Sequence, residues 1–220
     1  MELLEHIEIE PVTPARSTVI ILHGLGADGH DFEPVIPELN LPDSSGIRFI
    51  LPHAPMREVT INNGMEMRAW YDFIPHSETA GNDDIAESSL QLRAFIHREM
   101  ERGIPSERIL LAGFSQGGVI ALHTGTRFEH RLAGIVAMST YLHDFSATRS
   151  EMHDANLAIP ILMAHGTQDP MIPIMRAATS RENLIQLGYD VRWFDYPMGH
   201  QVCMEEIEAI SAFIREVLPT

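Results

Sequence analysis

Short runs of apolar, β-branched residues recur along the chain, separated by longer segments with a different periodicity. Each run is too short for a helix and is typical of a strand that is buried on both faces. The predicted strands lie at residues 17–22, 47–51, 109–114, 132–138, 161–165 and 191–196. Residues 5–10 instead alternate polar and apolar side chains, which favours an antiparallel strand at a sheet edge.

The segments between these strands carry apolar residues at helical spacing. They predict helices at residues 82–102, 174–187 and 201–217, and a further helix that begins near Gly117. The first of these opens on Asn82, a residue type that caps helices, and Gly103 follows its end. Strands that alternate with helices predict the α/β class, with a mostly parallel central sheet and helices on both faces.

The length of 220 residues fits one domain, residues 1–220, with a full hydrophobic core and no room for a large cap domain. No apolar run approaches the roughly 20 residues that span a bilayer, so we expect no integral membrane segment. The first residues carry no basic region followed by a long apolar stretch. We therefore expect no secretory signal and predict a cytoplasmic protein.

The charge balance narrows the choice of partners. The formal net charge is −16, and every basic side chain is an arginine. Nucleic acid and anionic membrane surfaces are disfavoured because phosphate contacts need clustered positive charge, and a lysine Schiff base is excluded. Cys203 is the single cysteine, and the 12 histidines show no paired ligand spacing, so we predict no metal.

The segment Gly113-Phe114-Ser115-Gln116-Gly117 matches Gly-x-Ser-x-Gly and stands between a predicted strand and a predicted helix. This is the context of a nucleophile elbow, in which a serine lies on a strained turn. Glycines let the strand and the helix approach closely, and the helix start offers N–H groups to a developing oxyanion. We predict Ser115 as the nucleophile; the alternative is a chance Gly/Ser turn.

A serine nucleophile needs a histidine base oriented by a carboxylate, and in this fold the chain order is serine, acid, histidine. After Ser115, only His165 and His200 lie at or just after a C-terminal strand. His165 as the base would leave no acid between a later strand and itself. We therefore predict His200, which follows the last strand; the alternative is a helix-capping or surface histidine.

The acid is expected in the loop after the preceding strand. Asp169 lies in that loop and is followed by Pro170. Among its competitors, Asp154 follows no strand, Asp190 belongs to a Gly-Tyr-Asp turn and Asp195 lies inside a strand. Asp169 is therefore the predicted acid, with an ordinary Asp-Pro turn as the alternative.

A glycine-rich loop, His23-Gly24-Leu25-Gly26, follows the strand predicted at residues 17–22. Its glycines let the backbone approach a substrate closely. A dinucleotide-binding loop would need a third glycine and a later acidic residue on a strand, which this segment lacks. We predict that the backbone amides of Leu25 and Gln116 form an oxyanion hole.

An acyl substrate would need an apolar groove, for which thioether and aromatic side chains are well suited. The candidates are Met65, Met67, Trp70, Met171 and Ile172. Core packing is the alternative for each of them. Residues 61–65 contain a turn-prone Asn-Asn-Gly sequence, which predicts a flexible flap beside the groove.

Taken together, the chain resembles the acyl-protein thioesterase / phospholipase–carboxylesterase family, a group of small α/β-hydrolase serine esterases. The matching segments run in the family's order across nearly the whole chain. They are Leu22–Asp28, Pro52–Pro55, Met67–Asp72, Gly113–Gly118, His165–Asp169 and Gly199-His200. After Asp169 the chain has Met171-Ile172-Pro173, where the family commonly has valines before the proline.

The resemblance implies the α/β-hydrolase fold and hydrolysis of carboxylic esters or thioesters without a cofactor. It places Ser115, Asp169 and His200 at the triad positions, and Leu25 and Gln116 at the oxyanion positions. The substrate would be a small-molecule or lipid ester or an acylated protein, and pairing of two copies in a homodimer is a further expectation. A non-catalytic binding protein on the same fold is the alternative from another class, and a metallohydrolase, a peptidase and a carbon–carbon hydrolase are further alternatives.

Overall fold

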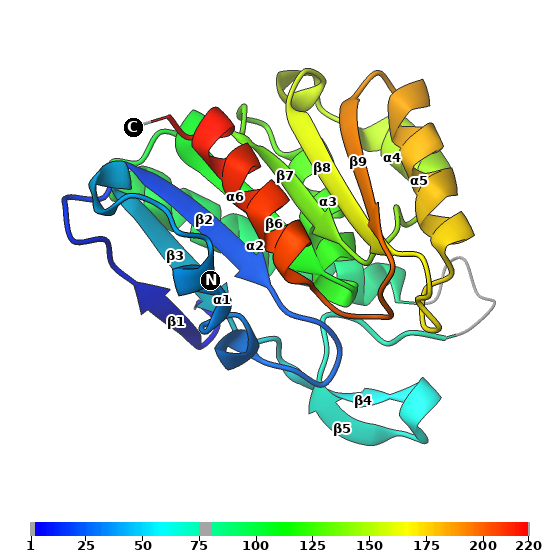
Figure 1. The fold of residues 1–220 in the computed structure, drawn as a ribbon. Coiled ribbons are helices and arrows are strands. Elements are labelled where there is room, and N and C mark those ends of the chain that lie inside the picture. Colours follow the sequence, from blue (N-terminus) through cyan, green and yellow to red (C-terminus); the bar gives the residue numbers. More distant parts are fainter. Residues whose placement is uncertain (1–2, 75–80, 220) are drawn as a thin grey trace.

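The computed structural model describes residues 3–74 and 81–219, and a seven-stranded sheet lies at its centre (Figure 1). The strands are β1 (His6–Ile9), β2 (Ser17–Leu22), β3 (Ile47–Pro52), β6 (Ile109–Phe114), β7 (Gly134–Met138), β8 (Pro160–Gly166) and β9 (Asp190–Tyr196). Their order in the sheet is β1-β3-β2-β6-β7-β8-β9. All neighbours are parallel except β1, which pairs antiparallel with β3. The predicted mostly parallel sheet with an antiparallel edge strand is confirmed.

Helices cover both faces of this sheet (Figure 1). On one face lie α2 (Asn82–Glu101), α3 (Gln116–Arg127) and α5 (Ile174–Gln186), and α4 (Phe145–Glu151) packs against α3. On the other face lie α1 (Val35–Glu38) and α6 (Met204–Val217). Alternate residues of each strand point to opposite faces, which produces two apolar cores. In β2, Ile20 faces α2 and α3 whereas Val19 and Ile21 face α6.

The start of α2 differs from the sequence prediction. The residue that caps the helix is Gly81, which adopts a left-handed φ of 80°, and not Asn82. A Cβ at Gly81 would lie 2.7 Å from the carbonyl oxygen of Asp72, so only glycine fits this approach. The Asn82 Oδ1 atom instead accepts a hydrogen bond from His143 Nε2 at 2.6 Å, because the cap position is already taken.

The last helix also differs, because α6 begins at Met204 and not at Gln201. Cys203 is its N-cap residue and has an extended backbone conformation. Residues 201–203 therefore continue the loop that carries His200, and the Gln201 N–H donates to the carbonyl of Gly199 at 3.1 Å within it. The apolar stripe of the helix gave no signal for this boundary, since Val202 also fits helical spacing.

A two-stranded hairpin that the sequence analysis did not predict projects from the end of the sheet (Figure 1). Its antiparallel strands are β4 (Met56–Val59) and β5 (Met65–Arg68). Residues 61–65, predicted as a flap, contain the turn of this hairpin. Asn63 and Gly64 take positive φ values of 58° and 75°, conformations that asparagine and glycine tolerate best.

The helices of residues 3–74 and 81–219 include none with the combination of length and hydropathy needed to cross a bilayer.

Candidate active site

The candidate site lies at the carboxyl ends of the parallel strands, where loops from four strands meet. Strands β2 and β6 are neighbours, and their register pairs Leu22 with Gly113. The chain leaves β2 toward β3 on one side and continues from β6 toward β7 on the other, which makes this a topological switch point. The glycine-rich loop after β2 and the Ser115 turn after β6 are therefore adjacent.

The loops after β8 and β9 are joined in the same way. The Thr167 N–H donates to the carbonyl of Tyr196 at 2.8 Å, and the Gln168 N–H donates to that of Met198 at 3.0 Å. A Cβ at Gly166 would lie 2.3 Å from the Gly199 carbonyl oxygen, so the two loops pack backbone against backbone. This pairing brings the residues that follow, Asp169 and His200, to the same place.

Ser115 occupies the strained turn that the sequence predicted. Its φ and ψ are 54° and −118°, a conformation that non-glycine residues rarely adopt. A Cβ at Gly113 would lie 2.2 Å from the Gly117 carbonyl oxygen, and one at Gly117 would lie 2.3 Å from that of Leu22. The two glycines of the motif are thus required by the close packing of β6, α3 and β2 around the serine.

Three side chains form a continuous chain of hydrogen bonds. The Ser115 Oγ lies 2.9 Å from His200 Nε2, and His200 Nδ1 lies 2.7 Å from Asp169 Oδ2. Because the carboxylate can only accept, Nδ1 carries the proton and Nε2 is free to accept from the serine. The structure therefore brings together the three residues that the sequence analysis chose, in the relative arrangement that a nucleophile, a base and an orienting acid require.

The environment of Asp169 keeps this carboxylate charged and oriented. Its Oδ1 accepts hydrogen bonds from the backbone N–H groups of Met171 and Ile172 at 2.8 and 2.9 Å. Burial by itself would raise the pKa of Asp169, but the hydrogen bond from His200 and those from the two N–H groups outweigh burial and lower the pKa below its usual value. An ionised, immobile acid is what a neighbouring imidazolium needs for stabilisation.

The other candidate bases and acids lie away from the serine. His165 is buried at the end of β8, and its Nε2 donates to the carbonyl of Ile172 at 2.8 Å, which supports the loop that carries Asp169. Asp154 lies in a short 3₁₀ turn, and Asp190 and Asp195 belong to β9. Among these residues, His165 alone approaches the site, with its Nε2 3.5 Å from Asp169 Oδ2.

The predicted oxyanion donors, Leu25 and Gln116, line the same cavity as Ser115. The N–H groups on either side of Leu25 are engaged, since Gly26 donates to the carbonyl of Arg68 and Ala27 to that of Gly24. No backbone carbonyl in the described ranges accepts from the Leu25 N–H. Gln116 is the first residue of α3, where an N–H has no acceptor within its helix. Both amides are therefore available to a bound oxyanion.

The buried side chains of His23 and Trp70 stabilise the glycine-rich loop that contains Leu25. His23 Nδ1 donates to the Gly24 carbonyl at 2.7 Å, and its Nε2 accepts from the Ala54 N–H at 2.9 Å. Burial lowers the pKa of His23 to about 4, so the ring stays neutral as these two bonds demand. The indole N–H of Trp70 donates to the His23 carbonyl at 2.8 Å. Sequence reasoning did not assign His23 a role, although its place directly after a buried strand was a usable signal.

A cavity of about 780 Å³ opens in front of Ser115. Its apolar side chains include Phe32, Met67, Phe73, Phe114, Met171 and Ile172. Met171 and Ile172 thus lie where an acyl groove was predicted, whereas Met65 and Trp70 do not line the cavity. The prediction for these two residues is wrong for different reasons. Met65 is 64% exposed at the start of β5, next to the turn of the hairpin, and Trp70 is buried in the core.

The aromatic lining was missed by sequence reasoning. Tyr71, Phe73 and Tyr141 line the cavity. Tyr71 lies in the matching segment Met67–Asp72 but was given no role, and Phe73 and Tyr141 lie outside the matching segments. In the described part of the chain, no group of three or more histidine, cysteine, aspartate or glutamate side chains is arranged to hold a metal ion.

Comparison with known proteins agrees with this geometry. The sequence profile of the Phospholipase/Carboxylesterase family matches residues 5–218. The chain belongs to the phospholipase/carboxylesterase family. This membership confirms the family suspected from the sequence segments and makes the protein an ester-hydrolysing serine hydrolase with the α/β-hydrolase fold.

Two curated relatives and two solved structures show the extent of the similarity. Acyl-protein thioesterase 1 of Neurospora crassa is 38% identical over 223 residues, which cover 96% of this chain and 91% of that protein. Acyl-protein thioesterase 1 of Cryptococcus neoformans var. neoformans is 34% identical, with 98% of each chain covered. The structure of Arabidopsis thaliana SOBER1 has a TM-score of 0.85 at 28% identity and covers 93% of this chain and 100% of that chain. The structure of esterase PE8 has a TM-score of 0.85 at 28% identity and covers 99% and 100%.

Proposed function

We propose that Ser115, His200 and Asp169 hydrolyse carboxylic esters or thioesters of acyl chains through an acyl-serine intermediate. The observation that carries this proposal is the hydrogen-bonded chain from Ser115 Oγ through the His200 ring to Asp169, at 2.9 and 2.7 Å. The serine faces a mostly apolar cavity, and Leu25 and Gln116, whose backbone N–H groups would bind the oxyanion, line it as well. These residues would supply a nucleophile, a base with its orienting acid, and two anion donors for one bound substrate.

In the first step, His200 Nε2 takes the Ser115 proton while the Oγ attacks the ester carbonyl carbon. The carbonyl oxygen becomes an oxyanion that the N–H groups of Leu25 and Gln116 stabilise. Collapse of this intermediate expels the alcohol or thiol, which receives the proton from His200. In the second step, His200 activates a water that attacks the acyl-serine, and the acid is released. Asp169 holds the ring in position and stabilises the imidazolium in both steps.

The cavity supports an acyl chain as the group that is transferred. Met67, Met171 and Ile172 provide adaptable apolar walls, and its volume of about 780 Å³ is that of a cavity for a small organic ligand. A small-molecule or lipid ester and an acylated protein both carry such a chain. The names of the two thioesterase relatives indicate an acylated protein as the substrate of those proteins. A homodimer and a cytoplasmic location remain predictions.

The test is the rate of Ser115→Ala with a panel of nitrophenyl esters, acyl thioesters and peptides. We expect kcat for the hydrolysed class to fall by roughly 10⁵-fold or more, because the covalent step is lost. Ser150→Ala, an exposed serine on α4, is the matched control and should keep the wild-type rate. Wild-type hydrolysis by Ser115→Ala would overturn the mechanism, and a wild-type protein that hydrolyses nothing would favour a non-catalytic binding protein.

A further inference from the structure

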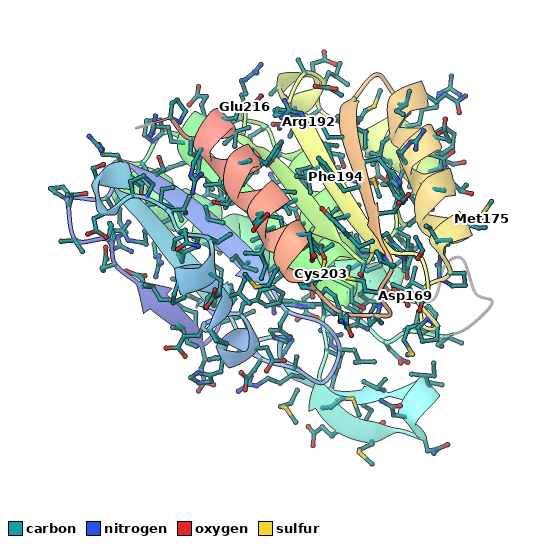
Figure 2. The ribbon with its side chains drawn as sticks, viewed as in Figure 1. Asp169, Met175, Arg192, Phe194, Cys203 and Glu216 are labelled. Atoms are coloured by element: carbon teal, nitrogen blue, oxygen red, sulfur yellow. The ribbon has the colours of Figure 1, made fainter. Side chains whose placement is uncertain are left out.

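Arg176 is a basic residue on the wall of the cavity that contains Ser115. It belongs to the first turn of α5, the helix that begins shortly after Asp169. Figure 2 shows its neighbour Met175 and Asp169 at the same end of the molecule. The mechanism of ester hydrolysis uses no such cation, so the position of Arg176 needs a separate explanation.

The guanidinium of Arg176 is held over an aromatic ring. Its central carbon lies 3.4 Å from the centroid of the Tyr141 ring, a cation–π contact that orients the planar group. No carboxylate of the described residues lies within 4.0 Å of it, whereas Arg181 on the same helix pairs with Glu182 at 2.8 Å. The hydrogen-bonding edges of Arg176 are thus available to a ligand that enters the cavity.

The place of Arg176 in its helix adds to the positive potential. The first turn of a helix is the positive end of the helix dipole, where acidic residues are favoured and basic ones are not. The first turn of α5 contains no acidic residue. Asp31 also lines the cavity, but it comes from the segment before α1. Helix α1 covers the face of the sheet opposite to α5. No acidic side chain in the first turn of α5 therefore offsets the positive charge of Arg176.

A hydroxyl donor lies beside this cation. The Tyr71 and Tyr141 hydroxyl oxygens are 2.9 Å apart, and both residues line the cavity. Two hydroxyl groups carry two protons, and the bond between them uses only one. In residues 3–74 and 81–219 no second partner accepts the other proton. A guanidinium and an O–H group that both lack an acceptor form a recognition site for an anion.

We propose that Arg176, supported by the tyrosine pair, binds an anionic group of the substrate, so that the enzyme prefers esters that carry a carboxylate or a phosphate. This inference rests on the proposed function and specifies its substrate class. The anion has two chemical sources: a carboxylate at the far end of the acyl chain, or a phosphate on the leaving group. Because Arg176 is exposed to solvent at the rim, salt should weaken the preference.

The experiment compares kcat/KM for anionic and neutral esters in wild type, Arg176→Gln, Arg176→Lys and Arg181→Gln. One arm uses nitrophenyl monoesters of dicarboxylic acids against nitrophenyl esters of unbranched fatty acids of equal length. The other uses lysophosphatidic acid against the monoacylglycerol with the same chain. Thermal melting of each variant checks that it is folded.

In the arm that matches the natural anion, we expect the ratio of kcat/KM for the anionic ester to kcat/KM for the neutral ester to fall about 10-fold in Arg176→Gln. The fall should come mainly from a higher KM for the anionic ester. Arg176→Lys should retain part of the ratio, Arg181→Gln all of it, and added salt should lower the wild-type ratio. If the wild type hydrolyses the neutral esters, and the anionic-to-neutral ratio of kcat/KM is the same in wild type and Arg176→Gln in both arms, the anion site is overturned and the proposed function is not. A wild-type protein that hydrolyses none of the esters overturns the proposed function itself.

Discussion

The loops that hold Ser115, His200 and Asp169 and the walls of the cavity in front of them are built by different means. The loops are fixed by backbone: glycines that no other residue can replace, and N–H groups that hold the Asp169 carboxylate. The walls are made of side chains, and several of them are solvent-exposed, such as Met171, which is 67% exposed. A wall residue can therefore be exchanged without moving the reacting groups, which explains how one scaffold serves many substrates.

After removal of the Ser115 hydroxyl, the largest effect is expected where these loops, the fixed region of the site, are altered without a change in side-chain size. Asp169→Asn keeps the size of the side chain but replaces an acceptor of the His200 Nδ1–H by a group that can donate, which favours the wrong tautomer. We expect kcat to fall by about 10⁴-fold, with little change in melting temperature.

Asp195→Asn is the matched control, since Asp195 is an exposed residue on the neighbouring strand β9. Steady-state kinetics with a nitrophenyl ester would measure both variants. Equal losses in the two variants, or full activity of Asp169→Asn, would show that the Asp169 contact is incidental to catalysis.

A smaller effect is expected on the stability of the fold. It tests whether the loop that contains Leu25 depends on a neutral His23 ring. The pKa of His23 is lowered by burial from 6.5 to about 4, so below pH 6.5 the unfolded chain binds a proton that the folded chain does not. The free energy of unfolding should thus decrease as the pH falls from 7 to 5, by about 2 kcal/mol from this group.

His23→Gln keeps a donor and an acceptor at this position but removes the titration. Urea unfolding of both proteins at pH 7 and 5 would measure the difference. We expect the variant to be less stable at pH 7 but to lose about 2 kcal/mol less between the two pH values. Equal losses in the variant and the wild type would contradict a buried neutral imidazole.

The smallest effect is expected on the walls, where two methionines of β5 form a matched pair. Met67 lines the cavity, and Met65 does not. Met67→Ala should raise KM for long-chain esters by about 5-fold, as expected for roughly 1 kcal/mol of lost apolar contact. Met65→Ala should have no effect, and a chain-length series would compare them. If both variants behaved alike, the cavity would not be the acyl site.

The difference between the backbone-fixed loops and the side-chain walls of the cavity also explains what the sequence could predict. The strands and the residues of the fixed region are marked by local signals: apolar runs, Gly-x-Ser-x-Gly, and an acid and a histidine that each follow a strand. The glycine at the start of α2 gave no such signal, because its requirement comes from a contact with Asp72 in another segment.

The cavity walls depend on contacts between segments that are far apart in the chain. Trp70 was predicted to face the substrate, but its backbone N–H bonds to the Gln116 side chain at 3.1 Å and its indole to the His23 carbonyl, which places it in the core. Arg176 belongs to α5 but stacks on Tyr141, which lies in the segment between β7 and α4. No periodicity or spacing within one segment reports such pairs, so the chemistry was predictable and the substrate was not.

The central claim, that Ser115 is the nucleophile, is tested most directly by labelling with a fluorophosphonate followed by peptide mass mapping. The chain contains no lysine, so trypsin releases residues 109–127 as one peptide in which Ser115 is the only serine. We predict one adduct per chain, on Ser115, with loss of esterase activity in proportion to labelling and no adduct in Ser115→Ala. An adduct on another peptide, or esterase activity that survives full labelling of Ser115, would contradict the account.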